Sequence, residues 1–124
     1  MDQNKERRRF PRIKDKDISV KLSGEGFNAL TQSLDLSASG IYCKVDRHMP
    51  LMTRVQIMLT LPGKNKASAP VTMNIEGVVV REHPIIKDGR VQHYDVAIFF
   101  NSLLPKERQL LIDHINRKTK AMAV

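Results

Sequence analysis

VTMNIEGVVVR (residues 71–81) and VQHYDVAIFF (residues 91–100) are rich in β-branched and aromatic residues, and Asp88-Gly89 lies between them. Asp-Gly flanked by strand-like segments is a strong signal for a hairpin with a two-residue turn. The first segment is long enough for one bent strand, with Gly77 as the expected bulge or corner. These residues therefore predict an antiparallel β-hairpin.

Shorter strand-like segments precede this hairpin. Apolar residues alternate with others at 18–22, 41–45 and 54–61, as expected of strands with one buried face. A turn at 23–26 leaves room for a further strand at about 27–34. The chain thus predicts five or six short strands in succession.

The hydrophobic period becomes helical near the end of the chain. Pro105 suits a first helical turn. Leu104 flanks this proline, and further apolar residues follow at spacings close to three and four: Leu110, Leu111 and Ile115. The basic residues beyond them complement a helix dipole: Arg117, Lys118 and Lys120. Strands followed by one such helix predict a mainly β fold, an antiparallel barrel closed or plugged by a C-terminal helix.

The composition limits the class of protein. A chain of 124 residues suits one domain with its own core. The single cysteine, Cys43, excludes an internal disulfide framework and a cysteine-rich zinc site, and its place on the apolar face of 41–45 predicts burial. No apolar run approaches the roughly 20 residues that span a bilayer, and no signal peptide is visible. We therefore expect a soluble cytoplasmic domain without membrane insertion.

Enzymatic activity has no support in the sequence. The four histidines fall in different predicted elements without the spacing of metal ligands, so each is expected at the surface or its boundary: His48, His83, His93 and His114. No nucleophile motif and no phosphate-binding P-loop is present. The sequence predicts neither a catalytic residue nor a metal or other cofactor.

Basic residues dominate the N-terminal segment, which reads Glu6-Arg7-Arg8-Arg9-Phe10-Pro11-Arg12. The formal net charge of the whole chain is +8, which attracts anionic partners of many kinds. An arginine fork forms bidentate bonds with phosphates and with the acceptor edge of guanine. Residues 1–16 are polar and charged enough to predict a flexible arm. On the arm alone, a solvated basic tail remains an open alternative.

A second short motif, Asp35-Leu36-Ser37-Ala38-Ser39-Gly40, follows further along the chain. An ionised aspartate accepts hydrogen bonds only, so Asp35 can receive the N1–H and exocyclic amine of guanine together. The Ser37 hydroxyl can bond a phosphate oxygen or a base edge, and Gly40 permits close approach of the backbone to a flat ligand. Taken alone, the motif also suits an ordinary Asp/Ser turn that opens a strand.

The two motifs together resemble the PilZ domain, a bacterial receptor domain for cyclic di-GMP. Arg8 and Arg12 match R-x-x-x-R, and residues 35–40 match [D/N]-x-S-x-x-G; the likeness extends over nearly the whole chain. The resemblance implies a six-stranded antiparallel barrel at 17–124, with a C-terminal helix, behind the flexible arm at 1–16. Val96 departs from the family, in which glycine is frequent at this position.

The resemblance also implies roles for individual residues. Arg8 and Arg12 would hold phosphates and guanine edges, Asp35 and Ser37 would bind a guanine, and Gly40 would allow close approach. Arg7 stands where an additional arginine accompanies a stacked ligand dimer in the family. The implied function is a receptor that orders its arm on binding and signals to a separate effector protein, with motility, secretion or exopolysaccharide machinery as candidate outputs.

Two other functions stay open at this point. A basic barrel could bind nucleic acid through the same arm, although exposed aromatics are scarce and Asp35 would repel phosphates. An adaptor could instead contact its protein partner without any ligand. The intact pair of motifs favours cyclic di-GMP over both.

Overall fold

The computed structural model describes residue 13, residues 18–65 and residues 67–122. Its elements are six strands and one helix: β1 (Ser19–Gly24), β2 (Phe27–Leu36), β3 (Gly40–Val45), β4 (Arg54–Leu61), β5 (Val71–Lys87), β6 (Arg90–Ser102) and α2 (Pro105–Met122). Apart from Ile13, the predicted arm at 1–16 lies outside the described residues, so its flexibility stays a prediction.

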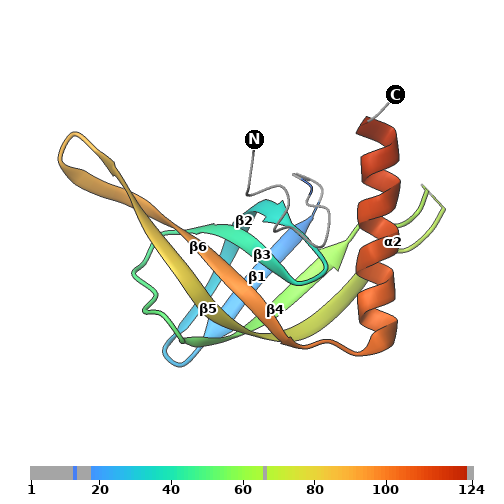
Figure 1. Ribbon diagram of the computed structural model, residues 1–124, viewed down its shortest axis with the longest axis horizontal. Coiled ribbons are helices and arrows are strands. Elements are labelled where there is room, and N and C mark those ends of the chain that lie inside the picture. The colour runs from blue at the N-terminus through green and yellow to red at the C-terminus, as the bar shows by residue number, and fades with distance from the viewer. Residues whose placement is uncertain (1–12, 14–17, 66, 123–124) are drawn as a thin grey trace, which may run out of the picture.

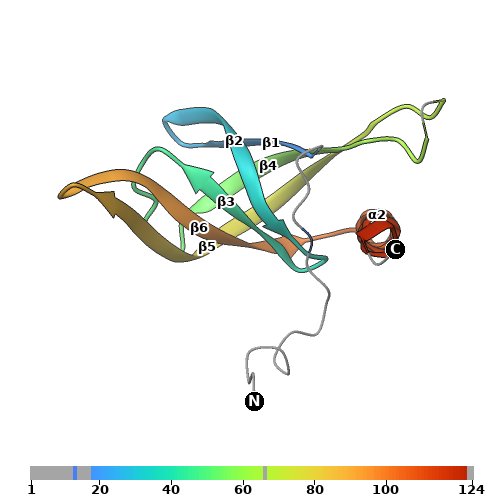
Figure 2. The same ribbon diagram turned by 90° about the horizontal axis from the view of Figure 1, so that it is seen from above.

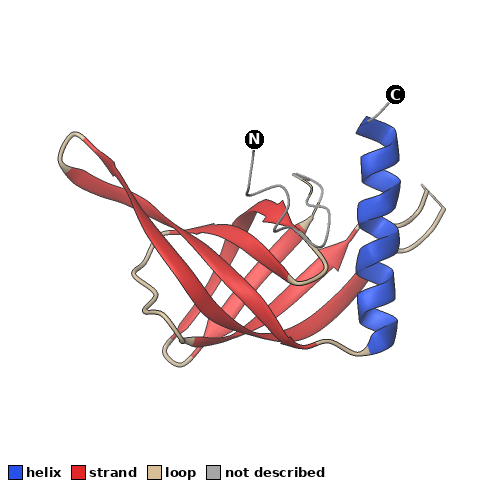
Figure 3. Ribbon diagram, viewed as in Figure 1, coloured by secondary structure: helices blue, strands red, loops and turns tan. Residues whose placement is uncertain are grey.

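The six strands form a closed antiparallel barrel in the order β1-β2-β3-β6-β5-β4 (Figure 1). Pairing of β1 with β4, from Ser19↔Thr60 to Ser23↔Gln56, closes the barrel. Figure 3 shows how strands make up nearly all of the body, with the single helix set apart at one end. The predicted mainly β fold and its C-terminal helix are confirmed.

The β5–β6 hairpin extends beyond the barrel as a two-stranded ribbon, away from the end where α2 lies (Figures 1 and 2). Asp88 and Gly89 form its turn with φ values of 53° and 74°, the left-handed pair that a tight hairpin requires. Both strands are longer than predicted, because the tight turn lets pairing continue from Lys87↔Arg90 into the barrel. The hairpin itself is confirmed.

The pairing between β5 and β6 is irregular within the barrel. The register shifts between Glu76 and Gly77, where the sequence predicts a bulge. It shifts again between Val79 and Arg81, which alternation alone does not indicate. This second bulge changes which β5 side chains reach the outer face near the middle of the barrel.

The barrel interior is filled by the alternating apolar residues. In β4, for example, the buried side chains are those of Val55, Ile57, Leu59 and Leu61. The helix adds Leu111 and Ile115, which are 0% and 1% exposed, to the same core. No helix in the described part of the chain is long and apolar enough to cross a membrane.

Leu104 precedes Pro105 and is 65% exposed, so it lies outside the buried stripe of the helix. One expectation for this region is wrong, because His114 is only 2% exposed rather than at the surface. Helical spacing explains this burial, since His114 follows Leu111 by three positions and lies next to Ile115 on the inward side.

Candidate functional site

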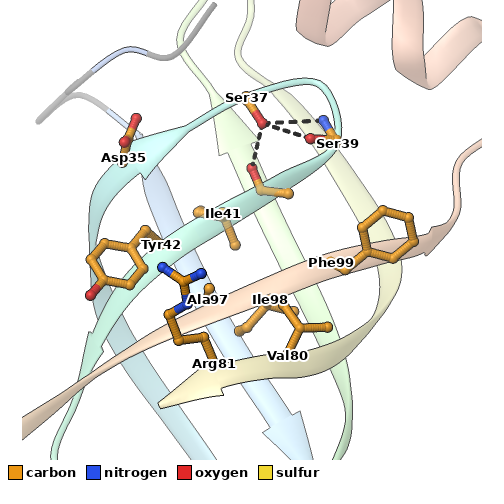
Figure 4. Close-up of a pocket in the computed structure, with 11 residues that line it drawn as sticks. Asp35, Ser37, Ser39, Ile41, Tyr42, Val80, Arg81, Ala97, Ile98 and Phe99 are labelled. Carbon is orange, nitrogen blue, oxygen red and sulfur yellow. Dashed lines mark hydrogen bonds between the residues drawn. The ribbon is translucent and has the colours of Figure 1, made fainter. Parts of the chain in front are cut away.

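A hollow of about 600 Å³ lies on the outer face of the barrel, across β2, β3, β6 and β5 (Figure 4). Three of the predicted site residues line it: Asp35, Ser37 and Gly40. The other three lie outside the described residues: Arg7, Arg8 and Arg12. The structure thus brings the second motif into one pocket and leaves the roles of the arginines as predictions.

One continuous row of paired residues crosses the pocket. Asp35 pairs with Tyr42, Tyr42 with Ala97, and Ala97 with Arg81, so four neighbouring strands each contribute one residue. At about 4.8 Å per strand, the row is roughly 14 Å long between its outer Cα atoms. Asp35 therefore stands at one end of the row and Arg81 at the other, and the Arg81 guanidinium extends back over small Ala97 toward Tyr42 (Figure 4).

Ile13 connects the N-terminal segment to the second motif, next to this pocket. Its backbone N–H donates to the Leu36 carbonyl at 3.0 Å, and Leu36 N–H donates back to Ile13 at 2.9 Å. The two side chains are 3% and 0% exposed, so both belong to the core. Leu36 is the residue between Asp35 and Ser37. The chain is thus fixed beside the second motif directly after Arg12, within the segment predicted to be arm.

The Ser37 side chain is turned into its own loop. Its hydroxyl lies 3.1 Å from Ser39 Oγ and 3.4 Å from the Gly40 carbonyl, and it accepts a bond from Ser39 N–H at 3.3 Å (Figure 4). The Ser37 backbone N–H also donates to Gly40 at 3.0 Å. Ser37 is 6% exposed, so in this structure it shapes the loop that joins β2 to β3. A direct bond from Ser37 to a ligand stays a prediction.

Gly40 is required by a neighbouring strand. A Cβ atom built on Gly40 would lie 2.4 Å from the Ile98 carbonyl oxygen, closer than any tolerated contact. Gly40 pairs with Phe99 of β6, and Phe100 N–H donates to Ser39 at 3.0 Å directly beside it. The glycine therefore permits close strand pairing at the pocket floor. Its approach to a ligand, as implied by the family resemblance, is untested.

Three further residues of the pocket did not emerge as candidates from the sequence: Tyr42, Arg81 and Phe99. None belongs to either motif, and they lie on three different strands. Only the cross-strand register brings them to the same face as Asp35. A prediction of the complete strand order would have been needed to find them.

Cys43 lies on the strand that forms the pocket floor, but its side chain is fully buried. Burial raises the pKa of the Cys43 thiol from 9.0 to about 12. Since the thiolate is the reactive form, we expect iodoacetamide at pH 8 to leave Cys43 unmodified in the folded protein and to modify it after denaturation. Mass spectrometry distinguishes the two; rapid modification of the native protein would contradict this burial.

Two of the described histidines lie next to acidic side chains. His48 Nδ1 lies 2.8 Å from Glu82 Oε1, and the same carboxylate accepts a bond from Met49 N–H, which ties the β3–β4 connection to β5. His93 Nε2 lies 3.2 Å from Asp95 Oδ1 within β6. Among residues 13, 18–65 and 67–122, no group of three or more His, Cys, Asp or Glu side chains could hold a metal ion.

Comparison with known proteins gives one family. The sequence model of the PilZ domain matches residues 6–117 of this chain. No curated protein matches the sequence significantly.

Three solved structures share the fold. The Bacillus subtilis inhibitor of motility (MotI/DgrA) has a TM-score of 0.74 at 17% identity, over 92% of this chain and 52% of its own. The PilZ domain of YcgR from Escherichia coli with c-di-GMP has a TM-score of 0.61 at 16% identity, over 94% and 97%. The MrkH–c-di-GMP complex from K. pneumonia has a TM-score of 0.63 at 19% identity, over 94% and 53%. The chain thus spans about half the length of MotI and MrkH.

Proposed function

Because this chain belongs to the PilZ domain family, we propose that it is a receptor for cyclic di-GMP, which binds in the pocket on the outer face of the barrel. The YcgR PilZ domain and MrkH carry this ligand in their solved structures, and their likeness to this chain supports the same fold. The assignment of the ligand depends on the residues of this chain.

The pairing of Ile13 with Leu36 is the observation that carries the proposal. Arg12 is covalently joined to Ile13, so the R-x-x-x-R segment ends beside the motif that holds Asp35 and Ser37. A chain extends at most about 3.6 Å per residue, which keeps the Cα atom of Arg8 within about 18 Å of Ile13. Both motif arginines are therefore within reach of a ligand in the pocket.

The chemistry of the two motifs is complementary for a guanine nucleotide. Asp35 accepts hydrogen bonds from the N1–H and exocyclic amine of one guanine. Arg8 and Arg12 hold the phosphates and guanine acceptor edges as bidentate donors. Arg7 adds charge next to them, which suits the doubled charge of a stacked ligand dimer. The ligand thus joins the N-terminal segment to the barrel.

Ordering of the N-terminal arm over the ligand is the proposed output. Coupled ordering of a segment typically costs about 2–5 kcal/mol of the gross interaction energy. The bonds from the arginines to the ligand offset this cost. The ordered arm then forms a new surface that a separate effector protein recognises.

Calorimetric titration of the purified chain with cyclic di-GMP tests the proposal, with GMP and a short oligonucleotide as controls at moderate salt. Saturable binding of cyclic di-GMP alone is expected, and a stoichiometry near two ligands per chain would support the role of Arg7. Binding of the oligonucleotide alone would favour a nucleic-acid-binding barrel instead. Absence of binding to all three ligands would favour an adaptor that contacts its protein partner without a ligand.

Arg81 is expected to contribute to affinity although it belongs to neither motif. It stands at the basic end of the row that begins at Asp35, and it is exposed to the pocket. We expect Arg81→Ala to weaken cyclic di-GMP binding roughly tenfold, the worth of one charge-assisted hydrogen bond. Arg90→Ala, an exposed arginine at the tip of the ribbon, is the matched control and should bind like the parent. If Arg81→Ala binds cyclic di-GMP as tightly as Arg90→Ala does, Arg81 does not contact the ligand.

A further inference from the structure

Phe99 exposes an aromatic ring in the pocket, an unusual place for so large an apolar side chain. It is 48% exposed, whereas its neighbours Ile98 and Phe100 are 1% and 5% exposed. Strand alternation explains its outward direction, since residues 98 and 100 point into the barrel. It does not explain why the outward position, which most often carries a polar side chain, holds a phenylalanine.

The neighbours of Phe99 leave it half exposed. Its partner on β3 is Gly40, which has no side chain, and its partner on β5 is Val78. Its outward neighbour along β6 is Ala97. Val80, at the second bulge of β5, lines the same pocket and is 50% exposed. Phe99 and Val80 are thus two exposed apolar side chains within a pocket whose other side carries Asp35 (Figure 4).

Asp35 and Phe99 lie at different places in the pocket. β3 lies between β2 and β6, so the two residues are two strands apart. Asp35 pairs with Tyr42 of β3 and Phe99 pairs with Gly40 of β3, so they are also two residues apart along the strands. With about 4.8 Å between strands and 3.4 Å per residue, their Cα atoms are roughly 12 Å apart. One end of the pocket therefore offers an acceptor for a base edge, and the other offers an apolar face.

We infer that Phe99 is a stacking subsite for the face of a purine base, separate from the site at Asp35 that binds a base edge. This inference rests on the proposed function and adds a residue that belongs to neither motif. A ligand with two purines, such as cyclic di-GMP, fills both positions. Aromatic side chains hold nucleic-acid bases by stacking in this way, and every base has a face to offer.

Three variants of Phe99 separate stacking from apolar burial. Phe99→Tyr keeps the ring, Phe99→Leu keeps an apolar side chain without a ring, and Phe99→Ala removes both. We expect Phe99→Tyr to bind cyclic di-GMP like the parent, and both other variants to bind it about tenfold more weakly. Val91→Ala, an equally exposed apolar residue of β6 on the ribbon, is the control and should leave affinity unchanged. Melting temperatures should stay close to that of the parent in all four variants.

The dependence on salt gives a second readout. Stacking involves no net charge, so the ratio of parent to Phe99→Leu affinities should be the same at low and high salt, while both affinities fall as the arginines are screened. If Phe99→Leu binds like the parent, the stacking subsite is refuted while the proposed function stands. If the parent itself binds no cyclic di-GMP, the proposed function fails first and the inference fails with it.

Discussion

Asp35→Ala is expected to weaken cyclic di-GMP binding by about 100-fold or more and to leave the melting temperature nearly unchanged. The substitution removes the acceptor for two guanine donors at once, and each hydrogen bond to a charged group is worth about 1.5–3 kcal/mol. Asp35 is partly exposed on the outer face and lines the pocket, so its loss creates no cavity in the core. Calorimetric titration and thermal melting of the same preparation measure both effects.

Asp46→Ala is the matched control for this experiment. Asp46 is an exposed aspartate that follows β3 and does not line the pocket, and its variant should bind like the parent. Arg8→Ala should abolish or strongly weaken binding, because it removes a phosphate contact from the other motif. Parent-like affinity of either Asp35→Ala or Arg8→Ala would overturn the assignment of the site.

Gly40→Ala is expected to destabilise the fold itself, by about 3 kcal/mol. The added Cβ would lie 2.4 Å from the Ile98 carbonyl, and that atom belongs to the backbone of β6, so only a shift of paired strands relieves the clash. For a domain of this size, such a loss lowers the melting temperature by roughly 10 °C. Thermal unfolding followed by circular dichroism measures this shift.

Ser39→Ala is the control that tests whether the loss of stability comes from the clash of the added Cβ or from any change in the loop between β2 and β3. Ser39 is the neighbour of Gly40, and its hydroxyl forms one bond with Ser37, so its loss should cost about 1 kcal/mol. A Gly40→Ala variant as stable as the parent would show that the strands yield at this point. In that case, the glycine would be needed for the ligand alone.

The fold could be predicted largely from local patterns. Alternation marked the strand at Arg54–Leu61 with the correct bounds, and Asp88-Gly89 marked the hairpin turn. These signals are local because the side-chain period of a strand and the positive φ of a tight turn depend on adjacent residues. The helix was found in the same way from Pro105 and its apolar spacing.

Contacts between distant segments could not be predicted in this way. The burial of Ile13 depends on its pairing with Leu36, and a lone isoleucine in a charged segment gives no sign of it. Arg81 and Phe99 reach the pocket through the register of β5 and β6, which includes a bulge that alternation does not reveal. Motif spacing located Asp35 and Gly40, but the closeness of Ile98 to Gly40 follows only from the paired strands.

The central claim is that cyclic di-GMP binds on the outer face of the barrel beside Ile13. Amide chemical shifts of the isotope-labelled chain, recorded by NMR during titration with cyclic di-GMP, test it most directly. The account predicts that the largest changes fall on residues 35–42, on Arg81 and on residues 97–99, while the ribbon tip at residues 87–90 stays unchanged. Saturable binding with unchanged signals at residues 35–42, or with the largest changes at the ribbon tip, would contradict it.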